Sequence, residues 1–227
     1  MTPPAGPAGP PADLGPDEAA RLDGTPDEMF YGMPRLVTHI DDAACAALAR
    51  YYATILREGD AVLDLMSSCV SHLPPAPRLA RVTGHGMNRT ELEANPQLTD
   101  YFLQNLNRTP ALPLETGSYR ACLMAVSVQY LVRPVTVFAE IGRVLAPGGA
   151  VAVSFSNRMF PTKAIAAWRA GDDRGRAALV TDYLARAGAF TDIRCLDLSP
   201  APGRSDPLFV VEARTVNPPE SGRQSST

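Results

Sequence analysis

The sequence predicts an α/β protein built on one doubly wound sheet of seven strands. Three observations support this. A short apolar strand ends at Asp64 and runs directly into small polar residues. Strand-like and helix-like segments alternate from about residue 60 to residue 213. A helix that starts at a proline ends in Pro147-Gly148-Gly149, and an apolar strand follows at once.

Composition limits what the chain can be. At 227 residues and 45% apolar, it suits a single soluble domain. A net charge of −3 argues against nucleic acid as the main partner. The four cysteines include no C-x-x-C pair, and the three histidines do not have the spacing of metal ligands. We therefore expect no metal site and a reducing, cytoplasmic setting. No apolar run is long enough for a membrane span, and the sequence allows a monomer or a homodimer.

Both ends of the chain have the composition of unstructured segments. Residues 1–26 are rich in Pro, Gly and Ala, and residues 216–227 are polar, so we expect two disordered tails. A single domain over residues 27–215 lies between them. Its first part, 27–57, is expected to be a lid, with an aromatic stretch around Tyr31 and a helix that opens at Asp41-Asp42 and ends at Gly59.

The central elements follow from local signals. Strands are expected at 61–65, at 81–86, at 101–106 and at 119–128. Asn88 is placed to cap a helix over 89–94, with Glu91 at the capping-box spacing. Pro134 opens the helix that leads to the strand at 150–155. Helices at 162–169 and 172–187 and strands at 190–196 and 208–213 complete the chain.

Several of these stretches resemble the motifs of class I S-adenosylmethionine (SAM)-dependent methyltransferases, in the type 11-like, small-molecule branch. Val62-Leu63-Asp64-Leu65 matches the first motif, Leu112-Pro113-Leu114 the turn before the fourth strand, and Ser127 to Leu131 the fourth motif. The stretch Glu140 to Gly149 reads E-x-x-R-V-L-x-P-G-G, the most specific match. The resemblance implies a Rossmann-like sheet whose last strand is antiparallel.

The resemblance also implies the cofactor, SAM, with S-adenosylhomocysteine (SAH) as its product and no metal. The residues that it places against the cofactor follow the first four strands: Asp64, Met66, Ser67, Ser68, Gly86, Met87, Asn88, Asn105, Leu106, Val126 and Ser127. Two departures stand out. Met66, Ser67, Ser68 and Val70 replace a glycine-rich loop, and Gly86 stands where an acid usually binds the ribose. Asn88 either binds one ribose hydroxyl or serves only as a helix cap.

Substrate and catalytic residues are expected from the lid and from the strand ends on the same edge. The expected substrate-binding set is Tyr31, Arg35, Gln129, Tyr130, Asn157, Arg158 and Phe160. The catalytic candidates are His72 and His39, as bases near neutral pH, and Tyr31, as a hydrogen-bond partner or an aromatic wall for the sulfonium. Each also has an ordinary interpretation: core packing for Tyr31, a surface ion pair for Arg35, and a capping or core role for His72.

Three functions are compatible with these residues. The first is methyl transfer from SAM to an O, N or S nucleophile of a small molecule, as in enzymes of microbial secondary metabolism with similar motif order. The second is a peptide or protein methyltransferase. The third is a non-catalytic SAM-binding regulatory domain, which the altered loop and the missing acid favour. The polar substrate-side segments favour an enzyme, and the lack of an obvious docking surface favours a small substrate.

Overall fold

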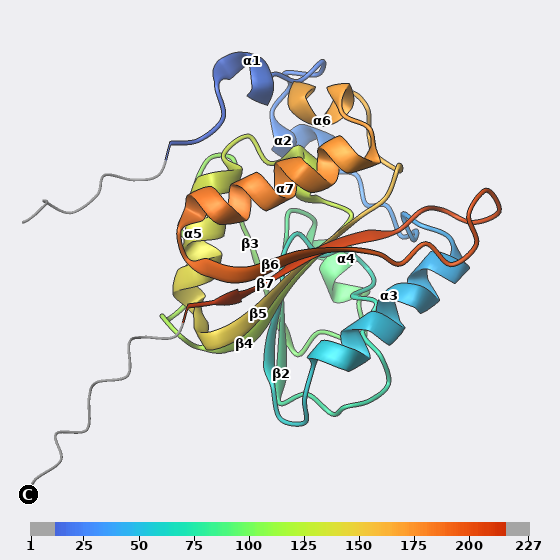
Figure 1. The fold of residues 1–227 in the computed structure, drawn as a ribbon, viewed down its shortest axis with the longest axis vertical. Coiled ribbons are helices and arrows are strands. Elements are labelled where there is room, and N and C mark those ends of the chain that lie inside the picture. Colours follow the sequence, from blue (N-terminus) through green and yellow to red (C-terminus); the bar gives the residue numbers. More distant parts are fainter. Residues whose placement is uncertain (1–11, 217–227) are drawn as a thin grey trace, which may run out of the picture.

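The computed structural model describes residues 12–216. Its seven strands form one sheet in the order β3-β2-β1-β4-β5-β7-β6 (Figure 1). The strands are β1 (Ala61–Asp64), β2 (Arg81–Gly86), β3 (Asp100–Leu103), β4 (Tyr119–Ala125), β5 (Leu145–Phe155), β6 (Phe190–Asp197) and β7 (Phe209–Thr215). Strand β7 runs antiparallel to both of its neighbours. The predicted fold class is confirmed.

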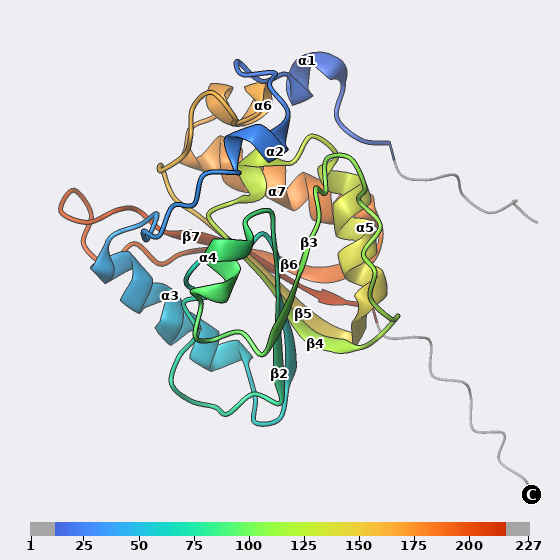
Figure 2. The same ribbon diagram turned by 180° about the vertical axis from the view of Figure 1, so that it is seen from behind.

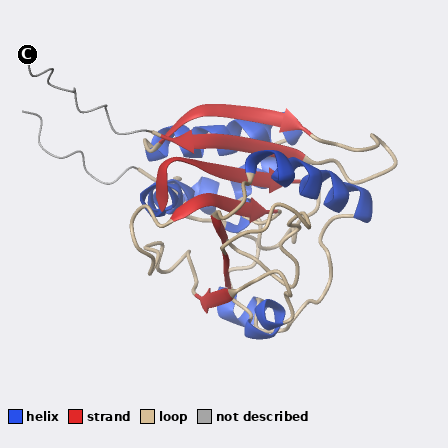
Figure 3. Ribbon diagram, turned by 90° about the horizontal axis from the view of Figure 1, so that it is seen from below, coloured by secondary structure: helices blue, strands red, loops and turns tan. Residues whose placement is uncertain are grey.

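Helices cover both faces of this sheet (Figure 3). Helix α3 (Asp42–Ile55) packs on one face, and α5 (Pro134–Val144) and α7 (Asp173–Ala187) pack on the other. The short helices α1 (Pro16–Ala19), α2 (Asp27–Phe30) and α6 (Ala166–Ala170) lie together at one end of the sheet (Figure 2). Helix α4 (Arg89–Glu93) and the 3-10 turn Val128–Tyr130 follow β2 and β4.

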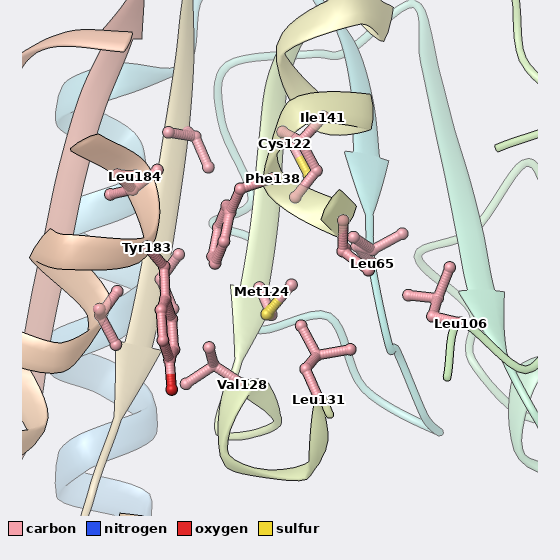
Figure 4. Packing of buried hydrophobic residues seen from close by; sticks show 14 of the residues in the cluster. Leu65, Leu106, Cys122, Met124, Val128, Leu131, Phe138, Ile141, Tyr183 and Leu184 are labelled. Carbon is pink, nitrogen blue, oxygen red and sulfur yellow. The ribbon is translucent and has the colours of Figure 1, made fainter. Parts of the chain in front are cut away.

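Two apolar clusters hold the layers together. The larger one contains Phe138 and Ile141 of α5, Tyr183 of α7, and Cys122 and Met124 of β4 (Figure 4). The smaller one joins α3 to the opposite face of the sheet, where Tyr52 is fully buried. Leu48 of α3 is also fully buried, and full burial of a leucine side chain contributes about 1.5–3 kcal/mol. Helix α3 is therefore a core helix, and only residues 27–41 of the expected lid, 27–57, border the cavity described below.

The expectation of a disordered tail over residues 1–26 is wrong for residues 12–26. Asp13 accepts hydrogen bonds from the Val135 amide, at 2.8 Å, and from the Thr136 hydroxyl, at the start of α5. Lys163 is fully buried and pairs with Asp23, at 3.4 Å, and with Asp27, at 3.5 Å. Composition pointed to disorder because it counts prolines and glycines, whereas these acids bind cations and amides far away in the sequence. Residues 1–11 and 217–227 lie outside the described residues.

Smaller differences concern element ends. Helix α3 ends at Ile55, with Leu56 as its C-cap, and Gly59 lies beyond it in a turn with a φ of 81°. Helix α6 starts at Ala166 rather than near residue 162. The cap at Asn88 forms as predicted, and Asp172 caps α7. Within residues 12–216, none of the helices has both the length and the apolarity needed to cross a membrane.

Candidate active site

A cavity of about 510 Å³ opens at the carboxyl ends of the parallel strands. This size is within the usual range for small-molecule and cofactor sites, and this edge of an open α/β sheet is where ligands bind. All eleven residues expected at the cofactor line it, as do the three catalytic candidates His39, His72 and Tyr31. Of the substrate-binding set, Arg35, Tyr130, Arg158 and Phe160 also line it.

Two expected substrate residues lie elsewhere. Gln129 is buried behind the cavity wall, where its amide nitrogen donates to the Val126 carbonyl at 2.9 Å. Asn157 is exposed and borders a separate surface hollow beside the loop 199–207. Both belong to motifs that reach the cavity, but the direction of each side chain depends on backbone angles that the motif does not specify.

Asp64 is the central acid of the site. Its side chain lies at the end of β1, is 2% exposed, and accepts a hydrogen bond from the Ser67 hydroxyl at 2.5 Å. Burial raises its pKa to about 6, and the hydroxyls of Ser67 and Ser71 lower it only in part. No cation among residues 12–216 contributes to this shift. A buried carboxylate without a counter-charge is costly, so Asp64 is suited to a positively charged ligand.

The loop after β1 is hydrogen-bonded to the end of β2. The Met66 amide donates to Nδ1 of His85 at 3.1 Å, and the Ser67 amide donates to the His85 carbonyl at 2.7 Å. A Cβ at Gly86 would lie 2.8 Å from the Ser67 carbonyl oxygen. This contact explains the missing ribose acid, because no side chain fits at position 86 while the loop has this course.

His85 fixes that loop. Because Nδ1 accepts from Met66, the ring proton is on Nε2, which donates to the Gln104 carbonyl at 3.0 Å. Burial lowers the pKa of His85 to about 4, so the ring is neutral at physiological pH. The imidazole thus joins the ends of β1, β2 and β3. In the sequence, the only signal for this role was a polar residue inside an apolar strand.

The segment 28–35 is hydrogen-bonded to Glu91 and to two residues expected to bind the adenosine part of the cofactor, Asn88 and Asn105. The Asn88 amide nitrogen donates to the carbonyls of Tyr31, at 2.9 Å, and Gly32, at 3.1 Å. Asn105 donates to Glu28 at 3.0 Å, and the Arg35 amide donates to Glu91 at 2.7 Å. Asn88 therefore caps α4 and holds the segment at once, which leaves it no free amide hydrogen for a ribose. We call these four hydrogen bonds the latch.

The catalytic candidates are neutral. Burial lowers the pKa of His72 to about 4, with the charge of a protonated His39 as the smaller cause. Burial also lowers the pKa of His39 and raises that of Tyr31. Neutral imidazoles can accept a proton, and a neutral phenol can donate a hydrogen bond.

Several residues that line the cavity have strained backbone conformations. Three of its lining residues, Met66, His72 and Val126, are non-glycine residues with φ between 50° and 58°. Such a conformation is costly, above all for a β-branched residue like Val126. The strain at the ends of β1 and β4 turns these residues toward the cavity, an arrangement common at functional sites.

Glu91 and Asp27 were not among the predicted site residues, yet both line the cavity. Glu91 accepts from the Ser68 hydroxyl at 2.8 Å as well as from Arg35. Asp27 binds Arg21 at 2.6 Å, Lys163, and the Asn107 amide at 3.0 Å. Within residues 12–216, no cluster of His, Cys, Asp and Glu is suited to a metal ion.

Comparison with known proteins gives one partial family match and several structures with the same fold. The methyltransferase-domain family model matches residues 70–153. The match begins just after the altered loop at 66–68. The solved structures with this fold include the SAM-dependent methyltransferase of Mesorhizobium loti, at 16% identity and TM-score 0.52, covering 74% of this chain and 98% of that one. They also include a putative SAM-dependent methyltransferase of Listeria monocytogenes, at 14% and TM-score 0.54, covering 77% and 99%.

A third structure with this fold is the [4+2]-cyclase SpnF, at 14% identity and TM-score 0.57, covering 84% of this chain and 92% of that one. No curated protein sequence matches the chain. At these identities the structural likeness establishes the fold. Together with the methyltransferase-domain match, it confirms the resemblance inferred from the sequence: the chain has the class I methyltransferase fold.

Proposed function

We propose that this protein binds SAM and transfers its methyl group to an O, N or S nucleophile of a small molecule. The observation that carries the proposal is Asp64, a buried acid without a counter-cation in the described chain, at the end of β1 in the large cavity. SAM carries sulfonium and ammonium groups, which are the positive charges that such an acid accepts. The methyltransferase-domain match supports the same interpretation.

The residues present fit the cofactor in part. Asp64 and the Ser67 hydroxyl offer polar contacts at the end of β1, and Leu106 offers an apolar surface after β3. The cofactor supplies an activated methyl group, and the protein aligns the acceptor with it and excludes water. His72 and His39 line the cavity and are neutral, and in this proposal one of them takes up the acceptor's proton. Position 86 offers no acid to the ribose. Among the carboxylates that line the cavity, Glu91 is the one nearest in sequence to the end of β2.

Titration calorimetry with SAM tests the proposal. The wild type should bind SAM, and Asp64→Asn should weaken binding roughly tenfold or more, because a hydrogen bond to a charged group contributes about 1.5–3 kcal/mol. Asp100→Asn is the matched control, since Asp100 is an exposed acid at the start of β3. Failure of the wild type to bind SAM would remove the proposal.

A regulatory SAM-binding role is the second candidate, and one observation favours it: the latch occupies Asn88 and Asn105, the residues expected to bind adenosine. A fold of this kind does not fix the reaction, since the structurally similar SpnF is a [4+2]-cyclase. Mass spectrometry of products from a panel of small acceptors separates the candidates. Methylated product supports the enzyme. SAM binding without product from any acceptor supports the regulatory role.

A further inference from the structure

One wall of the cavity is aromatic. Tyr130 and Phe160 stack with their ring centroids 5.8 Å apart, and Tyr31 meets Tyr130 edge-on at 6.3 Å. His39 meets Phe160 edge-on at 5.6 Å. All four residues line the cavity, and they come from the N-terminal segment and from the loops after β4 and β5. Such a wall offers flat apolar surface to a planar ring.

The charges around this wall disfavour anions. Of the two guanidinium groups that line the cavity, that of Arg158 is paired with Asp206 at 2.8 Å. The Arg35 guanidinium donates to the carbonyls of Phe30, at 3.1 Å, and Met33, at 3.2 Å. Arg35 is not in an ion pair among the described residues, so it keeps its positive charge, but it is a single cation among several acids. Carboxylates outnumber these cations in the lining and come from Asp27, Asp41, Asp64, Glu91 and Asp206.

Cations are disfavoured at the aromatic wall for a different reason. The Arg35 guanidinium lies over the rings of Phe30, at 4.6 Å, and Phe160, at 5.1 Å. It therefore occupies the ring faces that would attract a second cation, and it repels one electrostatically. The ring faces that remain are suited to an uncharged group.

Two buried hydroxyls in the cavity lining have no hydrogen-bond partner. They belong to Tyr31 and Ser127, and neither oxygen contacts any partner within residues 12–216. The Ser127 residue is 7% exposed. An unpaired buried hydroxyl is costly, so a ligand that supplies its partner is favoured. Ser127 directly precedes the turn that carries Tyr130, and both residues line the cavity.

We propose that the acceptor substrate is an uncharged molecule with a planar ring, which packs on Tyr130 beside the edge of Phe160. Its neutral polar group, such as a hydroxyl or carbonyl, pairs with the hydroxyls of Tyr31 and Ser127. This inference rests on the proposed function, because it names the acceptor for the same site. It assigns Ser127 to the acceptor, although the sequence motif grouped that residue with the cofactor.

The test uses three ligands of nearly equal size that differ in charge: 4-hydroxybenzamide, 4-hydroxybenzoate and 4-hydroxybenzylamine. Each is titrated against the wild type saturated with SAH, and binding is followed by saturation-transfer NMR. The neutral amide should bind at least tenfold more tightly than the anion and the cation. Equal or tighter binding of either charged ligand overturns the proposal, and so does saturation transfer to none of the three.

Variants that remove single hydroxyls test the polar contacts. Tyr31→Phe and Ser127→Ala should each weaken binding of the amide about fivefold and leave SAH affinity unchanged. Tyr183→Phe is the matched control, because the Tyr183 hydroxyl is also buried and unpartnered within the described chain but lies on α7, away from the cavity. An equal effect of Tyr183→Phe would contradict the proposal. Absence of SAH binding by the wild type would instead count against the proposed function.

Discussion

Replacing Asp64 by Asn should make the ligand-free protein more stable while weakening its binding of SAM. Burial holds the pKa of Asp64 near 6, against an ordinary value of 3.8. Between these two values the folded chain binds more protons than the unfolded chain. The stabilising effect of the protonated acid is thus complete below pH 3.8 and is lost as the pH rises through 6. Above pH 6 the wild type bears the cost of an ionised, buried carboxylate.

The size of the effect follows from the shift. About two pKa units correspond to roughly 3 kcal/mol at full expression, and local relaxation reduces this, so we expect a gain of about 1–3 kcal/mol at pH 7.5. The gain should shrink toward zero near pH 4. The neutral amide of Asn keeps the shape of the side chain and can still accept from the Ser67 hydroxyl.

Urea unfolding of the wild type and of Asp64→Asn, at four pH values from 4.5 to 7.5, measures this difference. Comparison at equal pH removes the contributions of His72 and His85, which both proteins share. Asp100→Asn should show no pH-dependent change, since Asp100 is exposed. A difference independent of pH, or an Asn variant less stable than the wild type at pH 7.5, would refute this account of Asp64.

Three further predictions concern catalysis, the latch and the N-terminal segment. His72→Ala or His39→Ala should lower turnover by about 10²-fold with little change in SAM affinity. At saturating SAM the wild-type turnover should not fall between pH 8 and pH 7, because the pKa of His72 is near 4 and Asp64, with a pKa of about 6, stays mostly ionised over this range. Full activity of both variants would leave alignment alone as the mechanism. Hydrogen exchange in residues 29–36 should slow when SAH binds. It should speed up in Asn88→Ala, because that variant loses both a helix cap and the Asn88 hydrogen bonds of the latch. Exchange that SAH does not affect would indicate a permanently packed segment. Lys163→Met should lower the free energy of unfolding by about 2–4 kcal/mol, because it leaves Asp23 and Asp27 with one cation fewer. It should also expose the peptide bond after Arg21 to trypsin. The control is Arg204→Met, a change at an exposed site, and cleavage no faster than in this control would count against a structural role for the ion pairs of Lys163.

Much of the fold can be predicted from local sequence. The apolar run before Asp64, the cap at Asn88 and the turn at Pro147-Gly148-Gly149 depend on neighbours within a few residues, so their signals are readable along the chain. The order of the strands then brings their carboxyl ends to one edge. This is why all eleven expected cofactor residues line a single cavity.

The tertiary structure decided what these side chains do. Asn88 holds the segment 28–35 through carbonyls 56 and 57 positions away, and Gly86 is closed off by the Ser67 carbonyl. The order of residues 12–26 depends on Lys163, far along the chain. Local propensity carries no information about such distant partners. The raised pKa of Asp64 is of the same kind, because burial is a property of the assembled fold and not of the sequence around the residue.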